Sequence, residues 1–183
     1  MLELARTGGA FYLHGAALLQ EGQAEVVCAA GGTGKSTLAA AWHAQGRPVL
    51  TDDAACLISG EPPLVAALPG PWRLSGPAAA WCGLPRSPHK TPFWPDVPEF
   101  DRAPIRRLWF AEQAPQSSRS LLRPGEALAR LVRQNPLLLA CQPLAQPHLD
   151  ALAALVDRSP AYHLALGPEL LGDPALVLNL LTV

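Results

Sequence analysis

The stretch AAGGTGKST, residues 29–37, combines glycines, a lysine and hydroxyl side chains in an order suited to holding phosphate. In such a loop consecutive backbone N–H groups converge on phosphate oxygens, and the positive end of the following helix faces the same anion. Lys35 is expected to contact the β and γ phosphates, and the hydroxyl of Ser36 to hold Mg²⁺. The pattern favours a phosphate-binding loop over the alternative, a glycine-rich turn before a core helix with no ligand.

Ala29 departs from the strict form of this loop, which has glycine at that position. Residue 29 stands at the end of an apolar strand, before the tight curve, so a methyl group is tolerated there if φ stays negative. Gly31, Gly32 and Gly34 lie closer to the expected phosphate.

A pair of carboxylates, Asp52-Asp53, follows the next apolar run. The carboxyl end of a strand beside a glycine loop is where open α/β sheets bind ligands. One carboxylate there would hold Mg²⁺, and the other would accept a proton from an attacking hydroxyl, as phosphoryl transfer requires. The alternative is a solvated turn or a helix cap.

The loop and the carboxylates need strands and helices to position them, and the hydrophobic pattern predicts both. Gly22 supplies a turn between two early strands, and Gly46 ends the helix that follows the loop. The unit from 24 to 58 is typical of a βαβ arrangement with a parallel strand pair. Strands are predicted at 11–20, 24–29, 47–51, 54–58, 64–68, 106–111 and 161–166, and helices at 35–45, 125–134, 149–157 and 174–181.

The composition fits one folded domain over 1–183, because the chain is 49% hydrophobic and only 16% charged. Three parts are distinguished: a nucleotide-binding core at 1–68, a proline- and tryptophan-rich loop region at 69–104 with one helical turn near 78–82, and a C-terminal α/β part at 105–183. The net charge of -1 argues against nucleic acid as a partner. We see no signal peptide or membrane span, and expect a cytoplasmic protein.

The order LHGAALL, VVCAAGGTGKSTLAAA and PVLTDDAACL resembles the C-terminal catalytic domain of HPr kinase/phosphorylase, and more closely the smaller HPr-kinase-like serine kinases. The resemblance covers residues 14–57. It implies a P-loop-containing α/β fold shared with ATP-dependent phosphoenolpyruvate carboxykinases, with a mixed sheet flanked by helices. It also implies ATP and Mg²⁺ as cofactors, and transfer of phosphate to a serine hydroxyl of a peptide or small protein.

The resemblance also assigns roles residue by residue. It places Asp53 as the base, Asp52 with Ser36 at the metal, and His14 and Lys35 beside them; His14 taken alone is more typical of a core residue. It assigns nucleotide binding to Ala30, Gly31, Gly32, Thr33, Gly34, Lys35, Ser36, Thr37 and Arg73.

Arg73 follows a Pro-Gly turn, as in the smaller relatives, and its guanidinium suits phosphate oxygens; a surface arginine beside a packed tryptophan is the alternative. Lys90 is a weaker candidate for the same task, and a solvated loop lysine is the preferred interpretation.

The resemblance has limits. The acidic, glycine-rich signature of the bifunctional enzymes is not found after Leu57, so it does not extend to phosphorylase activity or to HPr as substrate. Two alternatives stay open: an ATP-binding regulatory or peptide-maturation partner without catalysis, and a small-molecule kinase on the same scaffold. Assembly into a homo-oligomer is also left open.

Overall fold

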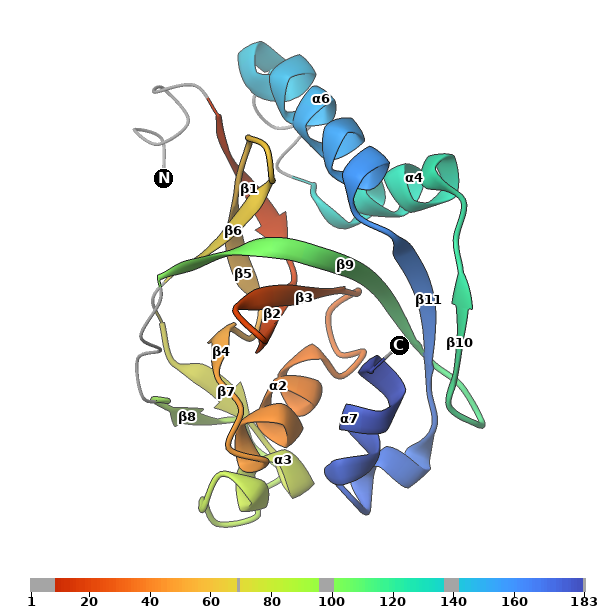
Figure 1. The fold of residues 1–183 in the computed structure, drawn as a ribbon. Helices are drawn as coiled ribbons and strands as arrows, with labels where there is room; N and C mark the ends of the chain where they lie inside the picture. The colour runs from red at the N-terminus through yellow and green to blue at the C-terminus, as the bar shows by residue number, and fades with distance from the viewer. Residues whose placement is uncertain (1–8, 69, 96–100, 137–141, 183) are drawn as a thin grey trace.

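The computed structural model describes residues 9–68, 70–95, 101–136 and 142–182, which form a mixed α/β structure (Figure 1). The strands are β1 (Ala10–His14), β2 (Ala16–Gln20), β3 (Gln23–Cys28), β4 (Val49–Thr51), β5 (Ala54–Ile58), β6 (Leu64–Ala67), β7 (Trp72–Leu74), β8 (Thr91–Phe93), β9 (Arg102–Gln113), β10 (Ser118–Leu121) and β11 (Ala161–Leu166). The helices are α2 (Lys35–Ala44), α3 (Gly76–Trp81), α4 (Pro124–Gln134), α6 (Gln142–Arg158), the 3₁₀ helix η1 (Pro168–Leu171) and α7 (Ala175–Leu181).

Strand β9 is the centre of a mixed sheet. It pairs in parallel with β3 and β11 and antiparallel with β6. From β6 the sheet continues through β5 to β1, and from β3 it continues through β2 to β4, while β10 pairs only with β11. Strands β7 and β8 form a separate two-stranded ribbon.

Both faces of the central strands are buried. In β9, Leu108 and Phe110 belong to a core beneath α4, α6 and the sheet of β1, β5 and β6, whereas Trp109 and Ala111 belong to a core beneath α2, α3 and α7. Figure 1 shows α4 and α6 on one side of β9, and α2, α3 and α7 on the other. Burial on both faces explains why the strands read as unbroken apolar runs rather than as alternating patterns.

A buried ion pair joins the central strands. The carboxylate of Glu25 on β3 accepts hydrogen bonds from Arg107 (2.9 Å) and from the indole N–H of Trp109 (2.7 Å), both on β9. Burial raises the pKa of Glu25, and the bond from Trp109 and the positive charge of Arg107 act in the opposite direction. Arg107 is therefore an interior partner of Glu25.

Two chain corners meet beside β3, the strand that leads into the glycine-rich loop. Strand β1 pairs with β5, and β2 pairs with β4, so the chain changes direction at His14-Gly15 and at Asp52-Asp53 in the same place. The N–H of Gly15 donates to the carbonyl of Asp53 at 2.9 Å. A Cβ on residue 15 would lie 3.0 Å from the carbonyl oxygen of Val27 on β3, which is closer than almost all real Cβ contacts, so glycine lets this corner lie close against β3.

The local predictions are largely confirmed. Glu21 and Gly22 form a two-residue turn between β2 and β3, both with positive φ, as hairpins prefer. Gly46 has φ of 71° just after α2, and its N–H bonds the carbonyl of His43, which confirms it as the residue that ends this helix.

Several longer-range predictions are wrong. The single strand at 11–20 is two strands, because Gly15 breaks it. The strands at 24–29 and 47–51 run parallel but are not paired, since β2 lies between them and is antiparallel to both. The 69–104 region contains α3 near the predicted helical turn, but also the β7–β8 ribbon and the first residues of β9. Residues 69 and 96–100 of that region lie outside the described part of the chain.

None of the helices in the described ranges has both the length and the apolar character that a membrane span requires.

Replacing Gly15 with alanine should lower the free energy of unfolding by roughly 1–3 kcal/mol, because the added methyl forces buried backbone apart. The matched control is Gly125→Ala in the first turn of α4, where a Cβ meets nothing within 4 Å. It should leave stability unchanged or raise it by up to about 1 kcal/mol. Chemical denaturation of the three proteins measures both effects, and equal stabilities would contradict the close approach at Gly15.

Candidate functional site

The loop between β3 and α2 has the backbone shape that its glycines predict. Gly32 has φ of 82° and Gly34 has φ of 122°, both in the left-handed region that favours glycine. The N–H of Leu38 bonds the carbonyl of Gly34 at 2.9 Å, so helix α2 begins directly at the end of the loop. The N-terminal N–H groups of α2 are thereby left facing the space in front of the loop.

Alanine at position 29 is accommodated. Ala29 is buried in the core under α2, and Glu21 is the one non-glycine residue of the described chain with a positive φ, so residue 29 keeps a negative φ. Its carbonyl accepts a hydrogen bond from Nζ of Lys35 at 2.9 Å. The missing glycine therefore costs the loop no backbone strain.

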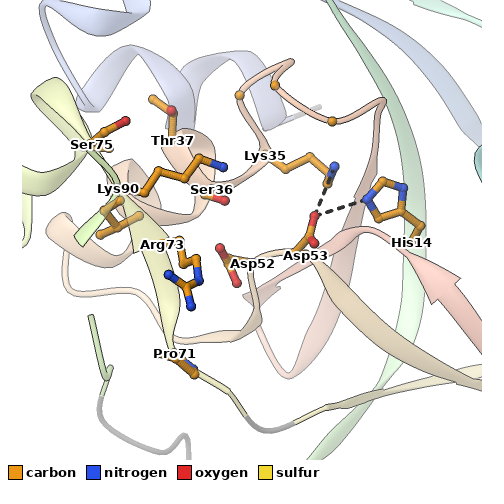
Figure 2. Close-up of a pocket in the computed structure, with 15 residues that line it drawn as sticks. His14, Lys35, Ser36, Thr37, Asp52, Asp53, Pro71, Arg73, Ser75 and Lys90 are labelled. Carbon is orange, nitrogen blue, oxygen red and sulfur yellow. Dashed lines mark hydrogen bonds and ion pairs between the residues drawn. The ribbon is translucent and has the colours of Figure 1, made fainter. Parts of the chain in front are cut away.

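Lys35 and His14 both contact Asp53. Nζ of Lys35 and Nε2 of His14 each lie 3.2 Å from Oδ1 of Asp53 (Figure 2). Lys35 is almost fully buried, whereas 59% of the Asp53 side chain is exposed. Because a carboxylate only accepts hydrogen bonds, the imidazole donates its Nε2–H to Asp53. The arrangement holds one exposed carboxylate between a buried cation and a ring donor.

Asn135, at the C-terminal end of α4, fixes the backbone of His14. Its Oδ1 accepts the N–H of His14 at 2.9 Å, and its Nδ2 donates to the carbonyl of Leu131 at 2.7 Å. Asn135 is fully buried. A residue far along the chain thus positions the histidine.

Asp52 faces the start of α2 and not the Asp53 group. Burial raises the pKa of Asp52; the hydrogen bond from Ser36 and the charge of Lys35 oppose this rise, while the negative charge of Asp53 adds to it. A buried carboxylate beside a hydroxyl, with its charge only partly compensated, is suited to accept a divalent cation. The two adjacent aspartates therefore lie in different environments.

A cavity of about 420 Å³ lies in front of these residues. Arg73 of β7 and Lys90, just before β8, line it from the side opposite His14, as Figure 2 shows. No ion pair of either cation is found among the described residues. Two cations directed at an open cavity indicate an anionic ligand.

The structure brings together most of the residues singled out in the sequence. The cavity is lined by His14, Gly31, Gly32, Gly34, Lys35, Ser36, Thr37, Asp52, Asp53, Arg73 and Lys90. Thr33 lines a neighbouring cavity instead. The carbonyl of Ala30 accepts a hydrogen bond from Nζ of Lys35 at 3.5 Å. Lys90 is exposed in the loop before β8, as expected of a solvated loop lysine, and it also lines the cavity.

Sequence reasoning missed two contributions. Pro71, Leu74, Ser75 and Ala78 form one wall of the cavity, and their proline- and alanine-rich segment carries no chemical signature. Asn135 follows a helix in an ordinary sequence context, so no local signal links it to His14.

The residues fit Mg²⁺ and a nucleoside triphosphate. Ser36 and Asp52 supply oxygen ligands of the kind that Mg²⁺ prefers. The negative charge of Asp52 is only partly compensated by its neighbours, so a bound cation would stabilise it. The loop N–H groups, Lys35, Arg73 and Lys90 suit phosphate oxygens.

Comparisons with known proteins add little. No protein-family model matches the chain, and no curated protein matches it significantly. Among solved structures, the Hpr(Ser) kinase/phosphatase from Coxiella burnetii is similar, with a TM-score of 0.49 and 11% sequence identity over 93% of each chain. A likeness at this level says nothing about activity, so the function proposed below comes from the site residues and their sequence motifs.

Replacing Asp52 with asparagine should stabilise the ligand-free protein, because a carboxylate whose pKa is raised by burial disfavours the folded state when ionised. The thermal midpoint should rise at neutral pH, and the gain should shrink as acid protonates Asp52 in the parent. Magnesium-dependent nucleotide binding should fall at the same time. Asp101→Asn, an exposed change, should shift stability by less than about 0.5 kcal/mol. A lower midpoint for Asp52→Asn would contradict this.

Proposed function

We propose that the protein is an ATP-dependent kinase of the HPr-kinase-like type, which transfers the γ-phosphate to a serine hydroxyl of a peptide or small protein. The observation that carries the proposal is that the two adjacent aspartates have different partners. Asp52 accepts a hydrogen bond from Ser36, whereas the exposed Asp53 contacts His14 and Lys35. Phosphoryl transfer needs both a metal ligand and a group that accepts the hydroxyl proton.

Binding of the donor depends on the charges of the cavity. Lys35, Arg73 and Lys90 outnumber the two carboxylates that line it, and a triphosphate carries several negative charges. Ser36 and Asp52 would hold Mg²⁺, which when bound neutralises further charge on the phosphates. The triphosphate therefore uses all of the positive charge in the cavity, and none is left to bind an acidic acceptor. This favours an acceptor with a neutral hydroxyl group, such as serine.

Asp53 performs the proton chemistry. Its carboxylate accepts the hydroxyl proton as the acceptor oxygen bonds to the γ-phosphorus and the bond from that phosphorus to the leaving ADP oxygen breaks. His14 orients the carboxylate through its Nε2–H. Lys35, which pairs with Asp53 and lines the same cavity, would also contact a phosphate oxygen of the bound donor.

The Asp53→Asn variant should lower phosphate transfer at least about 100-fold, because the amide cannot accept the proton, while the dissociation constant for Mg·ATP changes little. The assay incubates the protein with labelled ATP, Mg²⁺ and libraries of serine-containing peptides and small proteins, and detects the added phosphate by mass. Asp101→Asn is the control. Equal loss of ATP binding and transfer would reject the role of Asp53, and label on no acceptor despite ATP binding would reject the kinase in favour of an ATP-binding partner.

Arg73→Ala should raise the dissociation constant for ATP roughly tenfold, because a charge-assisted hydrogen bond to phosphate is lost. Arg86→Ala is the matched control, since Arg86 belongs to the same segment but does not line the cavity. Calorimetric titration measures both. Equal affinities for the two variants would show that Arg73 takes no part in nucleotide binding.

A further inference from the structure

A second cavity, of about 310 Å³, adjoins the phosphate loop on the side of β9 and β11. We propose that it binds the base and ribose of the nucleoside triphosphate, and that it favours adenine over guanine. The inference rests on the proposed function, because it assumes that a triphosphate binds in the first cavity.

The topology places this second cavity at the carboxyl ends of three strands. Strands β3, β9 and β11 are neighbours and run parallel, so their carboxyl ends lie at the same edge of the sheet. The phosphate loop follows β3, Gln113 and Ala114 lie at the end of β9, and Gly167 follows β11. Open α/β sheets bind ligands in the crevice at this edge.

The two cavities adjoin each other along the loop. Gly32, Gly34 and Thr37 line both of them. A ligand whose phosphates contact the loop and the start of α2 therefore lies next to the second cavity. Gln113 borders the junction, where its Nε2 donates to the carbonyl of Gly32 at 3.4 Å.

The linings of the two cavities differ in character. The first carries six ionisable side chains, whereas the second is lined mainly by Leu38, Leu166, Pro168, Leu170, Leu171 and Val177. Charged groups are absent from its described lining, where Thr33, Thr37 and Gln113 are the polar side chains. Apolar surface with few polar groups suits the faces of an aromatic base and excludes the phosphates, which sets the direction in which the nucleotide lies.

Leu171 marks the rim of this cavity. Its side chain is 48% exposed, which leaves a large apolar group in solvent beside the loop. Covering it with the face of a base removes that apolar surface from water. Its exposure also means that it can be changed with little effect on folding.

The polar groups that line the second cavity decide which purine base it binds. Guanine presents N1–H and an amino group side by side and needs acceptors for both, as a carboxylate would supply. None of the described residues that line the cavity carries a carboxylate, so the cavity offers guanine no charged acceptor for these two donors. Adenine presents a single amino group beside an acceptor nitrogen, which one side-chain amide such as that of Gln113 can match.

The test compares binding of Mg·ATP, Mg·GTP and Mg·tripolyphosphate by calorimetry to the whole chain and to two variants. Ala114→Phe fills the cavity, and Leu171→Ser removes apolar contact at the rim. Leu121→Ser is the matched control, because Leu121 is exposed on β10 and lies outside both cavities. We expect ATP affinity to fall at least tenfold in Ala114→Phe and severalfold in Leu171→Ser, with tripolyphosphate affinity unchanged in both and ATP affinity unchanged in the control.

The outcomes separate the base cavity from the proposed function. Equal affinity of the parent for ATP and tripolyphosphate, or unchanged ATP affinity in Leu171→Ser, would overturn the base cavity while the phosphate site stands. Tighter binding of GTP than of ATP would overturn the adenine assignment. Absence of binding of all three ligands to the parent protein would instead reject the nucleotide site itself.

Discussion

The hydrogen bond from the N–H of Gly15 to the carbonyl of Asp53 is the contact on which the site depends. It joins two chain corners, one between β1 and β2 and the other between β4 and β5, directly beside the strand that leads into the glycine-rich loop. A side chain at residue 15 would push against the backbone of that strand. The bond therefore brings the histidine, both aspartates and the loop together from segments that are separate in the sequence.

The charges of the site are arranged for a ligand more than for the stability of the empty protein. Two aspartates stand side by side, burial disfavours the charge of Asp52, and the cations Arg73 and Lys90 have no ion-pair partner in the described chain. Lys35 is the exception, since it bonds Asp53 and the carbonyl of Ala29. Adjacent like charges and unpaired cations of this kind are typical of functional sites. They lower the stability of the ligand-free protein and strengthen the binding of a ligand.

Features with a local cause were predictable from the sequence. The turn at Gly22, the end of α2 at Gly46 and the start of α2 at Lys35 depend on neighbouring residues, and the structure contains all three. The loop and the aspartates were found for the same reason, because each has a chemical signature within a few residues.

Features with a distant cause were not predictable in this way. Gly15 breaks an apolar run only because Val27 approaches it, and Arg107 is buried only because Glu25 lies opposite on β3. The strands β7 and β8 are too short to show a period, and Asn135 meets His14 across most of the chain. In each of these cases the deciding partner lies outside the segment in which the residue stands, so no window of sequence contains it.

The pairing of β3 with β9 has a consequence for the order in which the protein can form. The loop and both aspartates lie in the first third of the chain. The strand β9 begins only at Arg102, and its neighbour β11 begins only at Ala161. During synthesis from the N-terminus, the strand that carries the loop has one open edge until β9 has been made. Contacts of such separation must close long stretches of chain before they stabilise anything, which slows folding. The strand β3 and the loop that follows it, which carry the most recognisable motif, are thus among the last segments to gain all of their neighbouring strands.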